Sequence, residues 1–463
     1  MARESKVDGP HLGESASKIV WRLAWPAVAL NALQVGNMLL DTYFVGKLET
    51  AALTALGGST NVMFLLFSLA FAMGTASTAL VSRAYGAGQP EEFKRANRET
   101  LSTAIYLSFG LSVVGLLISP IVSRMLLPAS DTRAIQLMIE YLAIYCLGLP
   151  AYFIIQSLAG SLRGVGDTKS PMVISGLQIL LHVVLNYCLI FPRITILGLD
   201  LPGAGWGLRG AGAALTISAW LASLVYVLWA GRTPVGESWR IVWPDKEWFI
   251  RIMRIAMPAA VMSVVRVSSL FAFTLVLKGV ENGSYAIAAM TTGFRLESMA
   301  FMPAFGLSIA ASALVGQSLG MKRPERAERL GWVAAHYAAA VSGLIALVLF
   351  IFAEPISAHL IEGQRDVIPI TASFLRFICA TELFFAYGVV LVGGMQGAGD
   401  TKRPLWISLI ALWGLRVPLA VVLAYPVRMG ADGAWLAMSA TQLVQGLMCM
   451  VAWRQGKWKL TKV

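Results

Sequence analysis

Two segments, SLRGVGDTKSP at residues 161–171 and GMQGAGDTKRP at residues 394–404, carry the same motif 233 positions apart. Near the start of each half, WRLAWP at residues 21–26 matches MRIAMP at residues 253–258, at an offset of 232. Repetition at a nearly constant offset indicates that a chain contains copies of one structural unit. The sequence therefore predicts two halves with the same internal architecture.

The composition predicts a membrane protein. Of the 463 residues, 57% are hydrophobic and only 13% are charged, and the mean hydropathy is +0.69. An ordinary soluble domain has about a quarter of its residues charged, and one membrane span needs about 20 apolar residues. Because no long stretch alternates apolar and polar residues, the spans are expected to be α-helices. Twelve stretches are long enough: 19–46, 51–82, 100–119, 133–159, 170–192, 208–230, 248–279, 283–316, 328–353, 367–395, 404–426 and 431–453.

The net charge of +12 is interpreted as a topology signal, so we expect the lipid bilayer and no nucleic acid as a partner. Of the 37 lysines and arginines, 25 lie at the termini or in the loops on one side of the predicted spans, and 8 lie on the other side. Basic residues accumulate on the cytoplasmic side of membrane proteins. The distribution predicts a multi-pass protein of the cell (inner) membrane with both termini in the cytoplasm.

The expected fold class is an all-α integral membrane protein, with twelve transmembrane helices in two six-helix lobes around a central cavity. Since six is an even number, both copies have the same orientation, which places the pseudo-symmetry axis along the membrane normal. The expected domains are an N-lobe at residues 1–230, a cytoplasmic linker at residues 231–247 and a C-lobe at residues 248–463. A monomer is expected.

Ionisable and polar side chains inside spans define the candidate site. Inserting a charged side chain into the membrane costs about 2.5–3.5 kcal/mol, so such residues are usually functional. The first span presents one polar face and the fifth another, formed respectively by Gln34, Asn37 and Asp41 and by Gln178, His182 and Asn186. Facing each other, they would form a polar pocket to which Thr216 of the sixth span adds a hydroxyl. Asp41 there can bind a proton, or a metal cation such as Na⁺ if neighbouring oxygens complete the shell. A purely structural hydrogen bond of Asp41 to a neighbouring helix is the alternative.

The C-lobe carries different charges at the repeated positions. The counterpart of Asp41 is Phe273, and the counterpart of Gln34 is Arg266. Because unpaired buried charge is costly, we expect the charged residues of this lobe to form ion pairs. They are candidates either for proton or substrate binding or for a structural role: Glu297, Glu382, Arg266 and Arg295.

The paired GxGDTKxP segments, the twelve spans and the segment FMPAFGLSIAASALVGQ at residues 301–317 resemble the multidrug and toxic compound extrusion family. The resemblance covers nearly the whole chain. It implies export of amphipathic, often cationic organic compounds by alternating access, coupled to H⁺ or Na⁺ entry and without a cofactor.

The resemblance is to the branch of that family with a coupling aspartate in the first span, at the position of Asp41. Asn186 stands where that branch often has a second acid, and this departure favours H⁺ over Na⁺. Another branch carries a coupling glutamate at the position of Arg266, and an arginine cannot carry a proton or bind Na⁺. Coupling of that second kind is therefore not expected here.

The sequence offers two alternative functions. A flippase for lipid-linked precursors would have the same fold and would need a cationic cavity; the duplicated GDTK turn argues against it, whereas four in-span arginines keep it open: Arg266, Arg295, Arg376 and Arg416. A membrane-embedded enzyme would need clustered catalytic histidines, aspartates or cysteines, and the chain has only four histidines. No phosphate-binding GxxxxGK[ST] pattern occurs, so ATP-driven transport is disfavoured. We expect a transporter and no enzyme.

Overall fold

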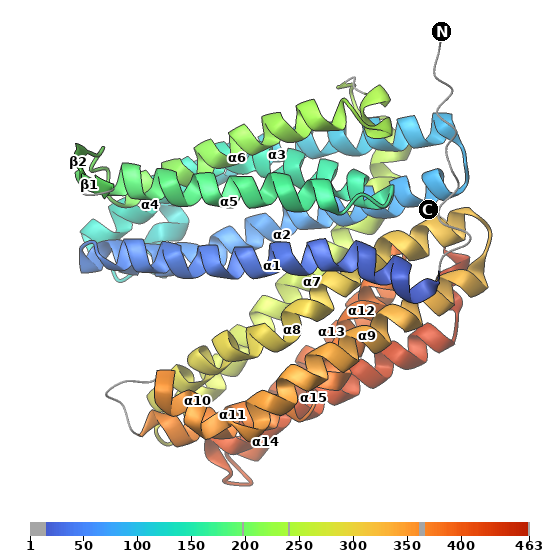
Figure 1. Cartoon of the computed structure of the whole chain (residues 1–463). Helices are drawn as coiled ribbons and strands as arrows, with labels where there is room; N and C mark the ends of the chain where they lie inside the picture. The colour runs from blue at the N-terminus through green and yellow to red at the C-terminus, as the bar shows by residue number, and fades with distance from the viewer. Residues whose placement is uncertain (1–14, 197–198, 239–240, 361–365, 462–463) are drawn as a thin grey trace. The chain divides into compact units, whose positions relative to one another are not determined.

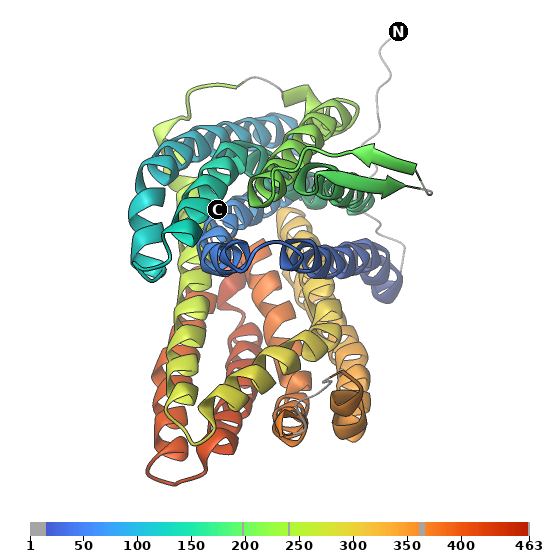
Figure 2. The ribbon, with the colours of Figure 1, turned by 90° about the vertical axis from the view of Figure 1, so that its left-hand side faces the viewer.

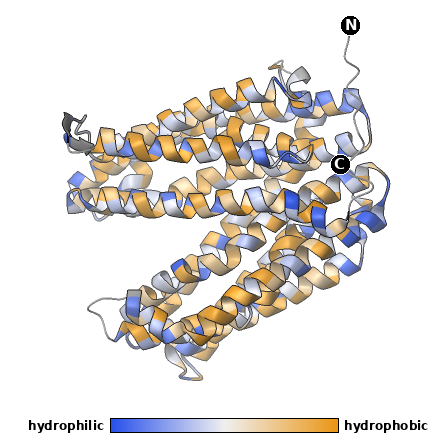
Figure 3. Ribbon diagram, in the orientation of Figure 1, coloured by the Kyte–Doolittle hydropathy of each residue, from blue (hydrophilic) through white to orange (hydrophobic). Residues whose placement is uncertain are grey.

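The computed structural model describes residues 15–196, 199–238, 241–360 and 366–461. Residues 1–14 of the expected cytoplasmic N-terminus and residues 239–240 of the expected linker lie outside these ranges. Within them, eleven helices are long and apolar enough to cross a membrane, and a bent pair brings the number to twelve. The predicted number of spans is thereby confirmed. Figure 3 shows hydrophobic residues along the length of these helices and hydrophilic residues gathered near many of their ends.

The helices follow one another in the order shown in Figure 1. The first half contains α1 (Ala16–Gly46), α2 (Thr50–Gly86), α3 (Pro90–Leu126), α4 (Thr132–Gly164), α5 (Lys169–Ile190), α6 (Leu208–Ala230) and the 3₁₀ helix η1 (Pro234–Ser238). The second half contains α7 (Lys246–Lys278), α8 (Gly283–Gly320), α9 (Pro324–Ile351), α10 (Ala353–Leu360), α11 (Val367–Cys379), α12 (Glu382–Gly397), α13 (Lys402–Leu409), the π-helix η2 (Ile410–Arg416), α14 (Val417–Ala424), α15 (Gly430–Arg454) and the 3₁₀ helix η3 (Lys457–Leu460).

The chain divides into two compact units. One comprises Ala29–Ala84 and Gln89–Ala256, and we refer to it as the N-unit. The other comprises Met1–Val28, Tyr85–Gly88 and Met257–Val463, and we refer to it as the C-unit. The lobe boundaries expected from the sequence remain a prediction.

Three local features were not predicted from the sequence. Strands β1 (Arg193–Ile196) and β2 (Leu199–Pro202) form an antiparallel hairpin between α5 and α6, drawn as two arrows in Figure 2. The predicted tenth span is broken into α11 and α12, which meet at an angle of 53°. The predicted eleventh span is interrupted by η2. Hydropathy measures only how apolar a segment is, so it does not detect breaks within an apolar helix.

The duplicated GDTK segments form the same turn in both halves. Gly166 and Gly399 adopt positive φ values of 93° and 84°, a conformation that favours glycine. The aspartate that follows accepts a hydrogen bond from the backbone N–H three residues later, at 2.9 Å for Asp167 and 3.3 Å for Asp400. These bonds cap the N-terminal ends of α5 and α13. The neighbouring threonines make no side-chain cap hydrogen bond.

Small residues allow a close helix crossing at equivalent positions of the two halves. In the N-unit, a Cβ atom on Gly160 of α4 would lie 2.3 Å from the carbonyl oxygen of Gly74 in α2. The Thr78 hydroxyl of α2 donates to the Gly160 carbonyl at 3.0 Å. In the C-unit, a Cβ on Gly393 of α12 would lie 2.6 Å from the carbonyl oxygen of Ser308 in α8. The repeated sequence therefore produces repeated packing.

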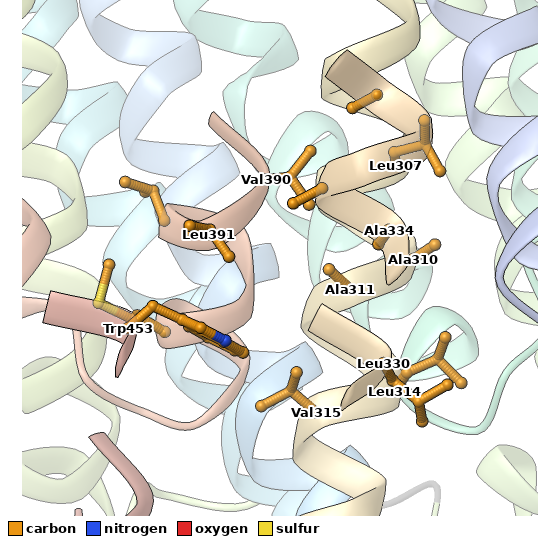
Figure 4. Close-up of a cluster of buried hydrophobic side chains, with 14 of the residues drawn as sticks. Leu307, Ala310, Ala311, Leu314, Val315, Leu330, Ala334, Val390, Leu391 and Trp453 are labelled. Atoms are coloured by element: carbon orange, nitrogen blue, oxygen red, sulfur yellow. The ribbon is translucent and has the colours of Figure 1, made fainter. Parts of the chain in front are cut away.

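The largest apolar core of the C-unit is built from α8, α9, α12 and α15, and Figure 4 shows part of it. Leu307 and Leu314 of α8 are buried against Leu391 of α12 and its neighbours. Trp453 at the end of α15 stacks on Trp458 of η3, with 4.0 Å between the ring centroids. This aromatic stack fastens the end of the chain to the helices of its unit.

Candidate functional site

Four of the predicted polar residues come together between α1 and α5 in the N-unit. Asn186 Nδ2 donates to Asp41 Oδ1 at 2.5 Å, and Asn37 Nδ2 lies 3.4 Å from Asp41 Oδ2. His182 Nδ1 lies 3.0 Å from Asn37 Oδ1. Each helix contributes two residues four positions apart, and this spacing places both side chains on one helix face. We call Asn37, Asp41, His182 and Asn186 the Asp41 cluster.

The hydrogen bonds define where the hydrogen of His182 lies. The Asn37 oxygen can only accept, so Nδ1 of a neutral His182 ring carries the hydrogen and Nε2 is an acceptor. His182 Nε2 has no hydrogen-bond partner among the described residues, and it lies 3.7 Å from Asp41 Oδ1. Two acceptors therefore face each other across this gap. A proton on the carboxyl group of Asp41 would give the pair a donor.

The Asp41 cluster is largely withdrawn from solvent. His182 and Asn186 are buried, at 2% and 1% exposure, whereas the side chain of Asp41 keeps 26% of its surface. Two buried tyrosines of α4, Tyr141 and Tyr152, lie within electrostatic reach of Asp41. Sequence reasoning did not include them, although their spacing of eleven residues places them on one helix face. Removal from water disfavours the charged form of a carboxylate, so this setting suits a group that takes up a proton.

Three of the predicted residues lie apart from the Asp41 cluster. Gln178 of α5 has no hydrogen bond to the cluster within the described ranges. Gln34 is exposed, and no hydrogen bond joins it to the cluster within the described ranges. The Thr216 hydroxyl donates to the carbonyl of Ile144 in α4 at 2.9 Å and thus joins α6 to α4. The Thr216 hydroxyl, which was expected to face Asp41, therefore bonds to a backbone carbonyl.

The acidic candidates of the second half lie in the C-unit and differ from the expected ion pairs. Glu297 of α8 is 3% exposed, and its Oε1 accepts a hydrogen bond from Gln442 at 3.3 Å. Glu382 of α12 is fully buried, and neither of its carboxyl oxygens has a partner among the described residues. Thr381 donates to the Gln442 carbonyl oxygen at 2.9 Å. The expectation of ion pairing was wrong for these two acids: among the described residues, Glu297 is bonded to the Gln442 amide and Glu382 has no hydrogen-bond partner.

The basic candidates of the C-unit have different environments. Arg266 of α7 and Arg295 of α8 are exposed. Arg376 of α11 lies 3.7 Å from Glu354. Arg416, the last residue of η2, is partly buried, and its Nε has no hydrogen-bond partner in the described part of the chain.

No three histidine, cysteine, aspartate or glutamate side chains are grouped as metal ligands within the described ranges. The chemistry of the Asp41 cluster is therefore that of one carboxylate with neutral hydrogen-bonding neighbours. It can exchange a proton, and it can attract a cation when it is charged.

Comparison with known proteins places the chain in a family. The MatE family matches residues 26–188 and 258–422, one segment in each half. The chain is 27% identical over 445 residues to a probable multidrug resistance protein NorM of Thermotoga maritima, covering 95% of this chain and 92% of that protein. It is 26% identical over 422 residues to an FAD transporter of Shewanella oneidensis, covering 90% of this chain and 89% of that one.

Solved structures share the fold. One is described as an outward-facing conformation of a multidrug resistance MATE family transporter of the MOP superfamily. It aligns with a TM-score of 0.88 at 20% sequence identity, over 97% of this chain and 98% of that one. Proteins of this kind are multi-pass membrane transporters driven by ion gradients, without a cofactor, and they are not enzymes. The two matched halves, the twelve spans and the shared fold show that the chain belongs to the MatE family of drug-exporting membrane transporters.

Proposed function

We propose that this protein exports amphipathic organic compounds, many of them cationic, by alternating access in exchange for protons that bind at Asp41. The observation that carries the proposal is the Asp41 cluster, a lone carboxylate surrounded by neutral polar groups between two candidate spans. Homologues named as multidrug resistance proteins support export of small organic substrates. The duplicated GDTK turn and the relatives named as multidrug resistance proteins do not favour a flippase for lipid-linked precursors, so that alternative is not proposed.

The proposed coupling is electrostatic. A charged Asp41 favours a bound cationic substrate, because opposite charges attract strongly where water is scarce. Protonation removes that attraction and supplies the hydrogen that the facing acceptors, Asp41 Oδ1 and His182 Nε2, lack. The proton and the substrate then stabilise different states of the transporter, which is the requirement for exchange.

The proposed coupling ion is H⁺, with Na⁺ as the alternative. Asn186 is an amide that donates a hydrogen bond to Asp41. The cluster therefore offers a metal cation one carboxylate, that of Asp41. Hard cations prefer several oxygen ligands. The side-chain oxygen of Asn186 is available as a further ligand, because it has no hydrogen-bond partner among the described residues. A proton needs no such shell.

We further propose that the protein acts as a monomer in the cell (inner) membrane, with both termini in the cytoplasm. The excess of lysine and arginine on the side of the termini supports this orientation.

Export from inverted membrane vesicles tests the coupling. The substrates are a cationic fluorescent dye and, because one relative is named an FAD transporter, FAD. Proton and Na⁺ gradients are imposed separately. We expect dye transport with the proton gradient, and we expect Asp41→Asn to abolish it while the amount of protein in the membrane stays unchanged.

The matched control is Glu49→Gln, which removes a carboxylate from an exposed position in the N-unit and should transport normally. Dye transport that persists in Asp41→Asn contradicts the proposed role of Asp41. Transport driven by the Na⁺ gradient and not by the proton gradient contradicts the choice of ion.

A further inference from the structure

In the N-unit, the segment that leads into α7 covers one face of α3. Arg95 binds the carboxylate of Asp245 at 2.7 Å, and the Glu99 carboxylate accepts from the backbone N–H of Asp245 at 3.1 Å. Further along α3, Tyr106 packs against Trp243, with 4.9 Å between the ring centroids. The covering segment is therefore amphipathic. Its acidic group lies near the start of α3, and its large apolar group lies at position 106, about 16 Å further along the helix.

Helix α9 is the repeat counterpart of α3. Residues 83–96 match residues 317–330 at an offset of 234. Each helix has a proline as its first residue, at position 90 and at position 324. Three residues after each proline comes a buried side chain, whose backbone N–H bonds to the carbonyl four residues earlier. The two helices therefore begin alike, and Arg329 of α9 stands at the position of Arg95 of α3.

The face that is covered on α3 is open on α9. Arg329 is exposed, and no hydrogen bond or ion pair joins it to another residue of the described ranges. The neighbouring Glu328 binds Lys459 instead, at 2.6 Å. Ser102 of α3 accepts a hydrogen bond from the covering segment, whereas its counterpart His336 is exposed. An acidic group from elsewhere can therefore reach Arg329.

Three helices of the C-unit contribute to this open surface. Arg329, Trp332 and His336 share one face of α9, because they follow one another at intervals of three and four residues. The guanidinium of Arg454 in α15 lies 5.6 Å from the centre of the Trp332 ring. Tyr387 of α12 contacts the Trp332 and His336 rings, at centroid distances of 6.3 and 5.6 Å. We call these five residues the α9 patch.

The chemistry of the α9 patch matches the headgroup region of a membrane. Tryptophan and tyrosine gather at membrane–water interfaces, and basic residues beside a span attract anionic headgroups. Arg454 is exposed and, like Arg329, forms no ion pair with another described residue. Guanidinium groups bind phosphate oxygens with paired N–H donors. The patch therefore offers two arginines to a phosphate that lies beside an aromatic surface.

We propose that the α9 patch binds the phosphate of an anionic phospholipid, for which phosphatidylglycerol is the probe. The phosphate takes the place at Arg329 that the Asp245 carboxylate takes at Arg95. The acyl chains then extend along α9, as the covering segment extends along α3. Ala340 stands at the position of Tyr106 and is exposed, so this part of the face has room for an acyl chain. The site goes beyond the proposed export function and does not depend on it.

Photo-crosslinking to the purified full-length protein in neutral detergent tests the site. The probe is phosphatidylglycerol with a diazirine on an acyl chain close to the glycerol ester, and mass spectrometry of peptides locates the crosslinks. We expect labelling of residues 329–340 at least fivefold above that given by phosphatidylcholine with the same acyl chains. The double variant Arg329→Gln/Arg454→Gln should lower this labelling at least tenfold, because both guanidinium groups are lost.

The control is Arg323→Gln, which removes an exposed guanidinium just before α9 and outside the patch, and which should label normally. Equal labelling of the double variant and the control overturns the proposal. So does equal labelling by the two lipids, or labelling by phosphatidylglycerol that leaves residues 329–340 unmodified.

Competition on the unaltered protein gives a second measurement that needs no variant. Unlabelled phosphatidylglycerol should suppress the labelling of residues 329–340, whereas the same amount of phosphatidylcholine should not. Failure of phosphatidylglycerol to compete overturns the proposal. Inorganic phosphate at millimolar concentration should leave the labelling unchanged, because it lacks the acyl chains. Suppression by inorganic phosphate would assign the arginines to a dissolved anion and overturn the proposal.

Discussion

At the scale of single residues, the Asn186 amide favours the charged form of Asp41, in opposition to burial, which disfavours it. Asn186 lies at hydrogen-bond distance, 2.5 Å, and is buried at 1% exposure. A hydrogen bond to a charged group contributes about 1.5–3 kcal/mol, and this one favours the charged form of the carboxylate. Asn186 therefore stabilises the state of Asp41 that attracts a cationic substrate.

Replacing Asn186 by leucine, which has a similar volume and no donor, should lower dye export at least tenfold. The physical reason is that Asp41 loses the donor that stabilises its charged form, and about 1.4 kcal/mol corresponds to a factor of ten. Initial rates of dye export in inverted vesicles, normalised to protein amount, provide the measurement. The matched control is Thr42→Val beside Asp41, because the Thr42 hydroxyl donates to the Met38 carbonyl of its own helix. Equal rates for Asn186→Leu and the control would refute this role.

At the scale of helices, backbone contact between α2 and α4 depends on glycine. The Cβ of an alanine at position 160 would lie 2.3 Å from the Gly74 carbonyl oxygen, a distance that no real Cβ contact shows. The neighbouring Ser77 and Ser157 hydroxyls bond to each other at 3.1 Å in the same crossing. Any separation of the helices therefore also weakens hydrogen bonds.

Gly160→Ala is expected to lower the melting temperature of the purified protein by several degrees, since overpacking costs about 1–3 kcal/mol. Gly57→Ala is the control, because no atom lies within 4 Å of a Cβ placed there and the residue lies in α2, one of the two crossing helices. In an exposed helix, alanine in place of glycine should be neutral or slightly stabilising. Thermal unfolding followed by tryptophan fluorescence compares the two variants. A melting temperature of Gly160→Ala equal to that of Gly57→Ala would disprove the tight crossing.

At the scale of the whole molecule, the segment that joins the two sequence halves is fastened to α3. Asp245 forms an ion pair with Arg95 at 2.7 Å, and its backbone N–H donates to Glu99 at 3.1 Å. Trp243 packs on Tyr106, with 4.9 Å between the ring centroids. The start of α7 thereby belongs to the N-unit, although most of α7 belongs to the C-unit.

Reversing the charge in Arg95→Asp should make the amides of residues 241–251 exchange hydrogen up to about fivefold faster, since an exposed ion pair contributes about 1 kcal/mol or less. The double variant Arg95→Asp/Asp245→Arg restores the pair with its charges exchanged, and the exchange rate should return. Lys94→Asp, with the same charge change one residue earlier, serves as control. The measurement is hydrogen–deuterium exchange by mass spectrometry. If the double variant exchanges as fast as Arg95→Asp, the ion pair does not hold the segment.

Sequence spacing was sufficient to predict much of the candidate site. Asn37 and Asp41 lie four residues apart, as do His182 and Asn186, and each pair must share a helix face once the segment is a helix. Such spacing does not show which way a neighbouring side chain bonds. Thr216 turned to a backbone carbonyl of α4, and Gln34 stayed exposed, because the rotation and packing of α6 and α1 decide those contacts.

By itself, the sequence determined that the chain has twelve membrane spans in two repeated halves, because apolar length and repetition are local properties of the chain. It also determined that a carboxylate lies inside the first span. Only the tertiary structure decided the partners of that carboxylate and the amide contact of Glu297. These features arise from contacts between residues more than a hundred positions apart, and the geometry of such contacts follows from how helices pack, which no single segment encodes.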